Sequence, residues 1–136
     1  KQGRPFALFC MDLDRFKLVN DTYGHVTGDK LLCQVANRLH GCIRATDYAA
    51  RLGGDEFALL LMGELTEDTC SRKAQLIRER IGAAYPIDGR DIVSGTSCGW
   101  ARYPAEGSSS EQVHVLADER MYQDKKRHHA RQGIKA

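Results

Sequence analysis

Three apolar segments of the chain are short and bounded by turn-forming or acidic residues. Residues 6–11 form an apolar run that ends at Asp12, which predicts a buried strand. Residues 48–52 and 57–62 are also apolar, and the sequence Gly-Gly-Asp-Glu separates them. Two apolar segments joined by a glycine turn are typical of a β-hairpin.

Other segments repeat their apolar residues at helical spacing. This pattern predicts helices over residues 31–43 and 70–84, each with one face toward a core, and a final helix that begins at about Glu111. Between the last two helices, residues 87–93 predict a small hairpin, and a strand is expected over residues 96–101.

This order of elements favours the α+β class. Strands followed by a hairpin, with helices between them, build a sheet with helices packed on it. We therefore expect a central, mostly antiparallel sheet of about five strands plus a small hairpin, surrounded by helices. With 136 residues, the chain has the size of one domain with one hydrophobic core.

Composition excludes several classes of protein. Hydrophobic residues make up 42% and charged residues 28%, so neither a disordered chain nor a fibrous repeat is indicated. The apolar runs are too short to cross a bilayer. The net charge of +2 is too small to imply a nucleic-acid partner. We expect no contact of this domain with nucleic acid or with a membrane.

The five cysteines are scattered and form no CxxC pair. This pattern predicts reduced, buried thiols and argues against a disulfide framework or a zinc site. Together with the absence of a signal peptide, it predicts a cytoplasmic location. The alternative is the cytoplasmic part of a larger protein that is attached to a membrane.

Carboxylates stand at two of the predicted turning points. Asp12 ends the first strand, and Asp55 and Glu56 lie in the hairpin turn. A central sheet could bring them to one edge, where carboxylates and substrate phosphates would hold magnesium. The alternative is that each acid is simply solvated, as isolated turn acids usually are.

Two motifs decide between these readings. The first runs from Asp12 through Asp14, Phe16, Lys17, Asn20 and Asp21 to Gly24-His25 and Gly28-Asp29, and the second is Arg51-Leu52-Gly53-Gly54-Asp55-Glu56-Phe57. They resemble, at matching separation, the two signatures of the GGDEF diguanylate cyclases. About sixteen fixed positions match, which leaves coincidence negligible. The resemblance implies a fold like that of nucleotide cyclases and polymerase palms.

The resemblance also implies an activity: two GTP molecules are joined into cyclic di-GMP, and two pyrophosphates are released. Asp12, the Leu13 carbonyl and Asp55 would coordinate one or two Mg²⁺ ions that bridge the triphosphate, with Mn²⁺ as the alternative ion. Glu56 would assist the metal or accept the proton of the attacking 3′-hydroxyl. Gly54 would let the nucleotide approach the backbone.

The segment after the first strand would bind phosphates. We expect the amides of Phe16 and Lys17, at the start of a short helix, to meet the β- and γ-phosphates together with the Lys17 ammonium. Asp14 would cap that helix by accepting from the same amides.

Asn20 and Asp29 match the family positions that read the base. Guanine offers N1–H and N2–H₂ donors to a carboxylate, whereas adenine has an acceptor at N1, so GTP is preferred over ATP. His25 would line the nucleotide site, with a structural histidine as the alternative.

Near the C-terminus, Lys125 matches a lysine that contacts the phosphates in the family. The chain then departs from the family pattern, because His128-His129 replace a Gly-Arg pair whose arginine is a second phosphate contact. Arg127 and Arg131 are the candidates to replace it. The alternative for this basic run is a solvated helix end.

Arg44 and Asp47 resemble the RxxD inhibitory site of the family, which binds the product as a feedback inhibitor. Both side chains suit a guanine edge. The alternative is an ordinary helix-end salt bridge. Arg72 and Arg78 are the candidates for a further arginine that completes this site.

One domain holds one GTP, so the active species is expected to be a homodimer. The chain contains no dimerisation module such as a coiled coil, which predicts a mostly monomeric, weakly active domain over residues 1–136, excised from a larger multidomain protein. One rival reading is a non-catalytic regulatory domain that binds GTP or cyclic di-GMP. Another is a palm-type enzyme for a different nucleotide, which Asn20 and Asp29 disfavour.

Overall fold

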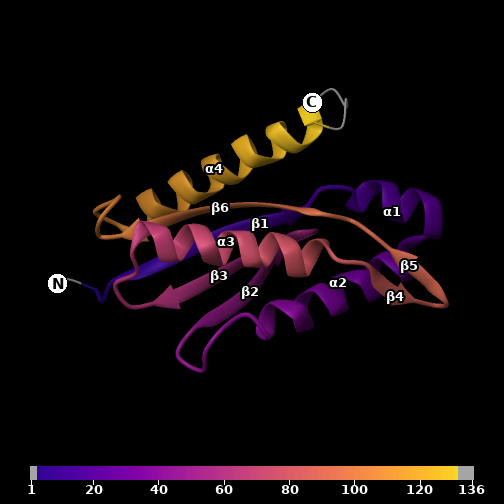
Figure 1. Ribbon diagram of the computed structural model, residues 1–136, viewed down its shortest axis with the longest axis horizontal. Helices are drawn as coiled ribbons and strands as arrows, with labels where there is room; N and C mark the ends of the chain where they lie inside the picture. The colour runs from indigo at the N-terminus through magenta and orange to yellow at the C-terminus, as the bar shows by residue number, and fades with distance from the viewer. Residues whose placement is uncertain (1–2, 132–136) are drawn as a thin grey trace.

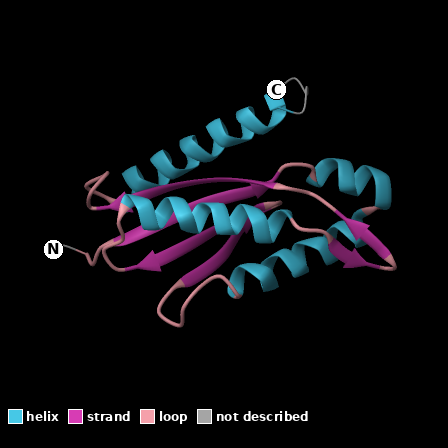
Figure 2. Ribbon diagram, viewed as in Figure 1, coloured by secondary structure: helices cyan, strands magenta, loops and turns pink. Residues whose placement is uncertain are grey.

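The protein is described by a computed structural model that covers residues 3–131. Its elements confirm the predicted α+β class (Figures 1 and 2). In chain order they are β1 (Phe6–Leu13), α1 (Phe16–Tyr23), α2 (His25–His40), β2 (Tyr48–Gly53), β3 (Glu56–Met62), α3 (Glu67–Gly82), β4 (Tyr85–Ile87), β5 (Arg90–Ile92), β6 (Thr96–Tyr103) and α4 (Ser110–Arg131).

The main sheet is antiparallel throughout. Within residues 3–131 it has four strands in the order β2-β3-β1-β6, and β4 and β5 form the separate small hairpin. Strand β1 has a hydrogen-bonded partner on both sides, because it lies between β3 and β6. Its end therefore lies between β3 and β6, two strands that are far from it in the sequence.

The two faces of the sheet carry separate cores. Phe9 and Leu59 face a large core that also contains Leu31 of α2 and Ile77 of α3. On the other face, Cys10 and four neighbours form a smaller core under α4. Figure 1 shows α4 on one side of the sheet, with α2 and α3 on the other. Since side chains alternate along a strand, the even-numbered residues of β1 face α4.

Gly99 of β6 allows α4 to lie directly on the sheet. A Cβ atom at this position would be 2.1 Å from the amide nitrogen of Met121 and 2.4 Å from the carbonyl oxygen of Ala117. These are backbone atoms of α4, so they cannot turn aside as a side chain would. The absence of a side chain at Gly99 thus sets the distance between α4 and the sheet.

Arg38 joins α2 to the end of α3. Its Nη1 donates to the carbonyls of Arg80 and Ala83 at 2.9 and 2.8 Å, and its Nη2 donates to that of Ala84 at 2.6 Å. The guanidinium also lies 3.6 Å from the ring centroid of Tyr85. One side chain thereby satisfies carbonyls that the end of α3 leaves without helical partners.

All five cysteines are free thiols, as predicted. Four are buried, but Cys33 is exposed, so the prediction of buried thiols is wrong at that position. Cys33 lies on α2 outside the apolar face that contacts the core. In the described part of the chain, the helices are either too short or too polar to span a membrane.

Candidate active site

The acidic residues of the first strand and of the hairpin turn lie at the same edge of the sheet, where β1 ends and β3 begins. Asp12 lies opposite Glu56 in the register of β1 and β3. The amide of Leu13 donates to the carbonyl of Asp55 at 3.3 Å. The antiparallel pairing of β1 with β3 thus brings together residues that are more than forty positions apart in the sequence.

Lys125 approaches this edge from α4. Its Nζ lies 3.0 Å from Oδ1 of Asp12, and the two side chains are 23% and 16% exposed. The contact follows from the fold, because Asp12 is an even-numbered residue of β1 and so faces the helix. This ion pair joins two residues that are 113 positions apart in the sequence.

The surroundings of Asp12 oppose its negative charge. Burial raises the pKa of this carboxyl group, and the nearby carboxylates of Asp55 and Asp14 raise it further, while Lys125 acts in the opposite direction. The carboxylates of Asp55 and Asp14 thus repel the charge on Asp12, and the Lys125 ammonium offsets part of that repulsion. A cation that joined them would relieve that repulsion.

The donor set fits a hard divalent cation that is completed by other ligands. Magnesium is usually held by one or two carboxylates together with substrate phosphates. Asp12, Asp55 and the Leu13 carbonyl supply oxygen donors of this kind. Within residues 3–131 there is no cluster of three or more His, Cys, Asp or Glu side chains that could enclose a metal alone.

Asp14 does not cap the following helix, and that prediction is wrong. The residue before α1 is Arg15, and no side chain caps this helix end. The amide of Asp14 donates instead to the carbonyl of Gly95 at 3.2 Å, which ties it to the chain entering β6. Its carboxylate accepts a hydrogen bond from the Ser97 hydroxyl and lies 2.9 Å from Nδ1 of His128.

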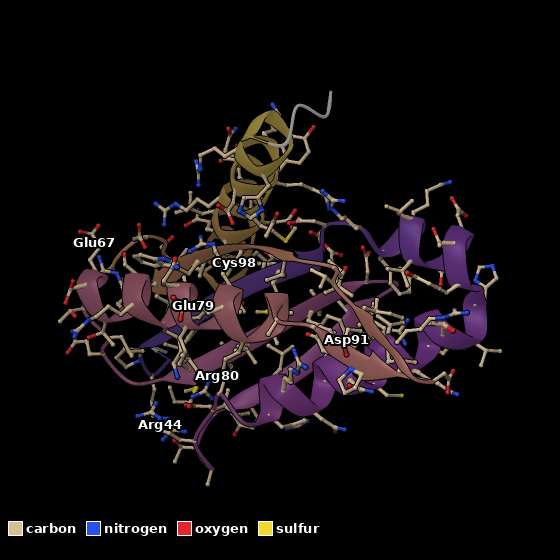
Figure 3. All side chains as sticks on the ribbon, turned by 45° about the vertical axis from the view of Figure 1, so that its right-hand side comes forward. Arg44, Glu67, Glu79, Arg80, Asp91 and Cys98 are labelled. Atoms are coloured by element: carbon tan, nitrogen blue, oxygen red, sulfur yellow. The ribbon has the colours of Figure 1, made fainter. Side chains whose placement is uncertain are left out.

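A second buried carboxylate, Asp124, fastens α4 to β6. It accepts from the amide of Cys98 at 2.9 Å and from Nε of Arg78 at 3.0 Å. Burial alone would raise the pKa of Asp124, but these two hydrogen bonds outweigh it and the pKa is lowered. Figure 3 shows Cys98 beneath α4.

Sequence reasoning missed this polar cluster of Asp124, His128, Ser97 and Arg78. A signal was present, because Asp124 continues the helical spacing of Ala117 and Met121, so an acid falls on the apolar stripe of α4.

Of the basic residues at the end of α4, Arg127 pairs with Asp124 at 3.2 Å and is 60% exposed. It therefore does not reach Asp12 in this structure. Arg131, the other candidate for the missing arginine, and His129 lie outside the residues whose side chains are described.

The predicted base-reading residues lie on two packed helices. Asn20 is on α1, and its Oδ1 is buried without a hydrogen-bond partner among the described residues. A Cβ atom at Gly28 of α2 would come within 1.8 Å of this oxygen, so any larger residue there would displace the Asn20 side chain from its present position. Phe16 packs against the main core and supports the same pair of helices.

Asp29 of α2 is exposed to solvent. It lines an open cavity of about 570 Å³ between α2 and the β4–β5 hairpin, together with Lys30 and Asp88. These two residues form a bidentate ion pair at 2.9 and 3.0 Å. His25 is the exposed first residue of α2. Among the hydrogen bonds and ion pairs of residues 3–131, none joins Asp29 to Asn20.

Two further predicted residues lie on the surface near the strand ends. Lys17 is exposed and pairs with Asp21 at 3.2 Å. Gly54 has a φ of 51°, and its carbonyl accepts from Nε of Arg51 at 2.8 Å. Gly54 is exposed, and a Cβ atom there would meet nothing within 4 Å, so the backbone at the tip of the hairpin is accessible from outside.

Arg44 and Asp47 bind each other. Oδ2 of Asp47 accepts from Nε of Arg44 at 2.9 Å, and Oδ1 accepts from Nη2 at 2.9 Å and from the amide of Met62 at 3.0 Å. Burial raises the pKa of Asp47, but the hydrogen bonds from Arg44 and Met62 dominate and lower it to about 2. The structure therefore contains the local salt bridge that was the alternative at this site.

The candidates for the further arginine of the inhibitory site bind other residues in the structure. Arg78 binds Asp124 under α4, and Arg72 pairs with Asp68 at 2.8 Å on the surface of α3. Arg44 itself is 61% exposed, and Figure 3 shows it at the edge of the molecule away from α4.

The chain is similar to proteins of a known family. A family model described as diguanylate cyclase, GGDEF domain, matches residues 1–131. The chain is 42% identical over 125 residues to the bifunctional diguanylate cyclase/cyclic di-GMP phosphodiesterase MucR of Pseudomonas aeruginosa. The matched region covers 92% of this chain and 18% of that protein. This chain thus spans about a fifth of the length of that relative.

Solved structures are similar as well. The crystal structure of the GGDEF domain of YfiN from Pseudomonas aeruginosa superposes with a TM-score of 0.86 at 35% identity, over 91% of this chain and 78% of that one. The GGDEF domain of DgcB from Caulobacter crescentus, solved in complex with c-di-GMP, gives a TM-score of 0.77 at 29% identity, over 97% and 75%.

Proposed function

Because this chain belongs to the GGDEF family of diguanylate cyclase domains, we propose that it condenses two GTP molecules into cyclic di-GMP. The meeting of Asp12, Asp55 and Lys125 at the end of β1 carries this proposal. Two carboxylates beside a lysine can bind the divalent cations and the phosphates of a nucleoside triphosphate.

The ion that we propose is Mg²⁺, with Mn²⁺ as the alternative. Asp12, Asp55 and the Leu13 carbonyl would hold it, and the triphosphate would complete its coordination. When bound, it neutralises the charge that develops around the α-phosphate. The Lys125 ammonium would leave Asp12 and donate to the phosphates.

The reaction requires one proton acceptor for each bond formed. The 3′-oxygen of one GTP attacks the α-phosphorus of the other, the bond to the β-phosphate oxygen breaks, and pyrophosphate leaves. We assign the proton of the 3′-hydroxyl to Glu56, which lies opposite Asp12 in the sheet. A second, identical step closes the ring.

Asn20 and Asp29 would select guanine. The buried Oδ1 of Asn20 lacks a donor in the structure, and guanine carries N–H groups that supply one. Asp29 would accept from guanine N1–H and N2–H₂. The amides of Phe16 and Lys17 with the Lys17 ammonium, His25 and the backbone at Gly54 would surround the rest of the nucleotide.

Two copies of the domain must face each other, since each would hold one GTP. Positioning the two nucleotides then supplies most of the rate acceleration. We further propose that cyclic di-GMP is a feedback inhibitor that binds at Arg44. Because Asp47 accepts from two N–H groups on one edge of that guanidinium, Asp47 acts there by orienting Arg44.

The test is synthesis of cyclic di-GMP from GTP and Mg²⁺ by the domain fused to a dimerising coiled coil. We expect product from wild type, less than 1% of that rate from Asp55→Asn by order of magnitude, and an unchanged rate from the control Asp91→Asn in the exposed β4–β5 hairpin. If wild type bound GTP but made no product, the domain would be a regulatory GTP-binding module. The histidine at position 129, where the family has an arginine, favours that second candidate.

A further inference from the structure

The end of α4 is attached to the protein differently from its beginning. Val113, Ala117 and Met121 are buried in the core between α4 and the sheet. After Met121, the side chains of Asp124, Lys125 and His128 make polar contacts with β6, with β1 and with Asp14 just beyond β1. The position of the last turns is therefore set by hydrogen bonds and ion pairs.

His128 makes a connected set of these contacts. Its Nδ1 lies 2.9 Å from Oδ2 of Asp14 and 3.2 Å from the Ser97 hydroxyl, which itself donates to the other oxygen of Asp14. The side chains of His128 and Asp14 are 17% and 6% exposed. Two strands and one helix thus converge on a single shielded carboxylate.

The spacing of this contact matches that of Lys125. Lys125 and His128 are three residues apart on one face of α4, and their partners Asp12 and Asp14 are two residues apart on one side of the strand and its extension. Along the axis of the helix and along the strand, each of these two separations is about 5 to 7 Å. The helix and the strand end therefore run side by side, joined at two points.

We propose that His128 is a positioning residue of the nucleotide site: its contact with Asp14 holds the last turns of α4 against β1 and so keeps the Lys125 ammonium within reach of the phosphates. This inference rests on the proposed function, since it assigns His128 a purpose through Lys125. It also gives a physical role to the position at which the chain departs from the family motif.

The anchor matters most once ligand arrives. In the structure, Lys125 itself ties α4 to Asp12. Cations and a triphosphate at Asp12 would draw Lys125 away from that carboxylate. His128 with Asp14, and Asp124 with Cys98, then remain to keep the helix end in place.

The test is binding of Mg²⁺ with a GTP analogue in which a methylene group replaces the oxygen between the α- and β-phosphates. Calorimetry on His128→Ala should show an affinity about tenfold below wild type, because a charge-assisted contact to phosphate is misplaced. His128→Asn, whose amide nitrogen stands near the place of Nδ1, should restore affinity to within about threefold. Lys126→Ala is the control, because Lys126 lies over the exposed Tyr122 ring on the solvent face of the same turn.

A double-mutant cycle separates positioning from general stability. In a Lys125→Ala background, His128→Ala should change the affinity by less than about twofold, since the residue it positions is gone. An equal loss in both backgrounds, or no loss in the single variant, overturns the proposal.

Hydrogen exchange of the α4 backbone provides a readout that does not depend on nucleotide. The amides of residues 124–131 should exchange faster in His128→Ala than in wild type and Lys126→Ala, while those of residues 113–121 stay protected. Unchanged exchange at the helix end overturns the anchor. If wild type did not bind the analogue at all, the proposed function would be wrong. Hydrogen exchange would still test whether His128 holds the end of α4 in place. Should His128→Ala not fold, Ser97→Ala removes the bridging hydroxyl and is read by the same two measurements.

Discussion

Replacing Gly99 by alanine should push α4 off the sheet. The added Cβ would stand 2.1 Å from the amide nitrogen of Met121, whereas real Cβ contacts are essentially never shorter than 3.0 Å. The helix backbone must retreat by about 1 Å to reach even that distance. Lys125 lies one turn beyond Met121, so the displacement reaches the candidate active site.

Two effects of this change can be estimated. Overpacking a core by one methyl group costs about 1–3 kcal/mol, and each kcal/mol lowers the melting temperature of a domain of this size by about 4 °C. Gly99→Ala should therefore lose roughly 4–12 °C. A misplacement of about 1 Å at an active site can cost about 100-fold in rate. Cyclic di-GMP synthesis by the dimerised domain should fall further than stability alone explains.

Thermal and urea unfolding measure the first effect, and product formation well below the melting temperature measures the second. Gly82→Ala is a matched control, because a Cβ at that helical glycine would meet its nearest neighbour at an ordinary 3.9 Å. It should be neutral or stabilising by up to about 1 kcal/mol. A Gly99→Ala variant as stable and as active as wild type would refute the claim that this glycine sets the height of α4.

Three further substitutions test other contacts. Arg38→Ala should lower the free energy of unfolding by about 2–3 kcal/mol in urea titrations, because three carbonyls at the end of α3 lose their donor; Arg38→Lys should not restore it. Asp47→Asn should lose about 2 kcal/mol at pH 7, since the pKa of Asp47 is lowered to about 2. That difference should be full above about pH 4 and shrink as the pH falls through about 2, as unfolding series at several pH values would show. Asp12→Asn should change stability by less than about 1 kcal/mol, because the raised pKa of Asp12 marks a carboxylate whose charge is not well stabilised, yet calorimetry should show no Mg²⁺-dependent nucleotide binding.

The sequence predicted the strands and most helices because their apolar patterns are regular. It placed the start of α2 too late, since residues 25–30 do not show a helical apolar stripe and Val26 is 69% exposed. That first turn is fixed by packing of α2 on α1, where Gly28 lies against Asn20. Such contacts depend on tertiary structure and have no periodic signal in the chain.

In the candidate site as well, one feature could be predicted from the sequence and another depended on tertiary contacts. The proximity of Asp12 and Asp55 could be predicted, because Asp12 lies near the end of one strand and Asp55 in the turn just before another. Antiparallel pairing of β1 with β3 brings those two positions together. The role of Asp14 could not be read in this way. An aspartate before a helix usually caps it, and only the approach of Ser97 and His128 from distant segments directs the carboxylate elsewhere.

The ion pair between Lys125 and Asp12 stabilises the charges of the candidate site before any ligand binds. Three carboxylates at the end of β1 repel one another, and an ammonium supplied by α4 offsets part of that repulsion. A divalent cation arriving with a triphosphate would exchange this pair for two others, metal with Asp12 and lysine with phosphate. Since neither charge would be left buried without a partner during the exchange, the desolvation cost of assembling the complex would stay low. That exchange would work only if the backbone carrying Lys125 stayed in place while its side chain moved, which is the role that we propose for the polar contacts of His128 and Asp124 on the same turns of α4.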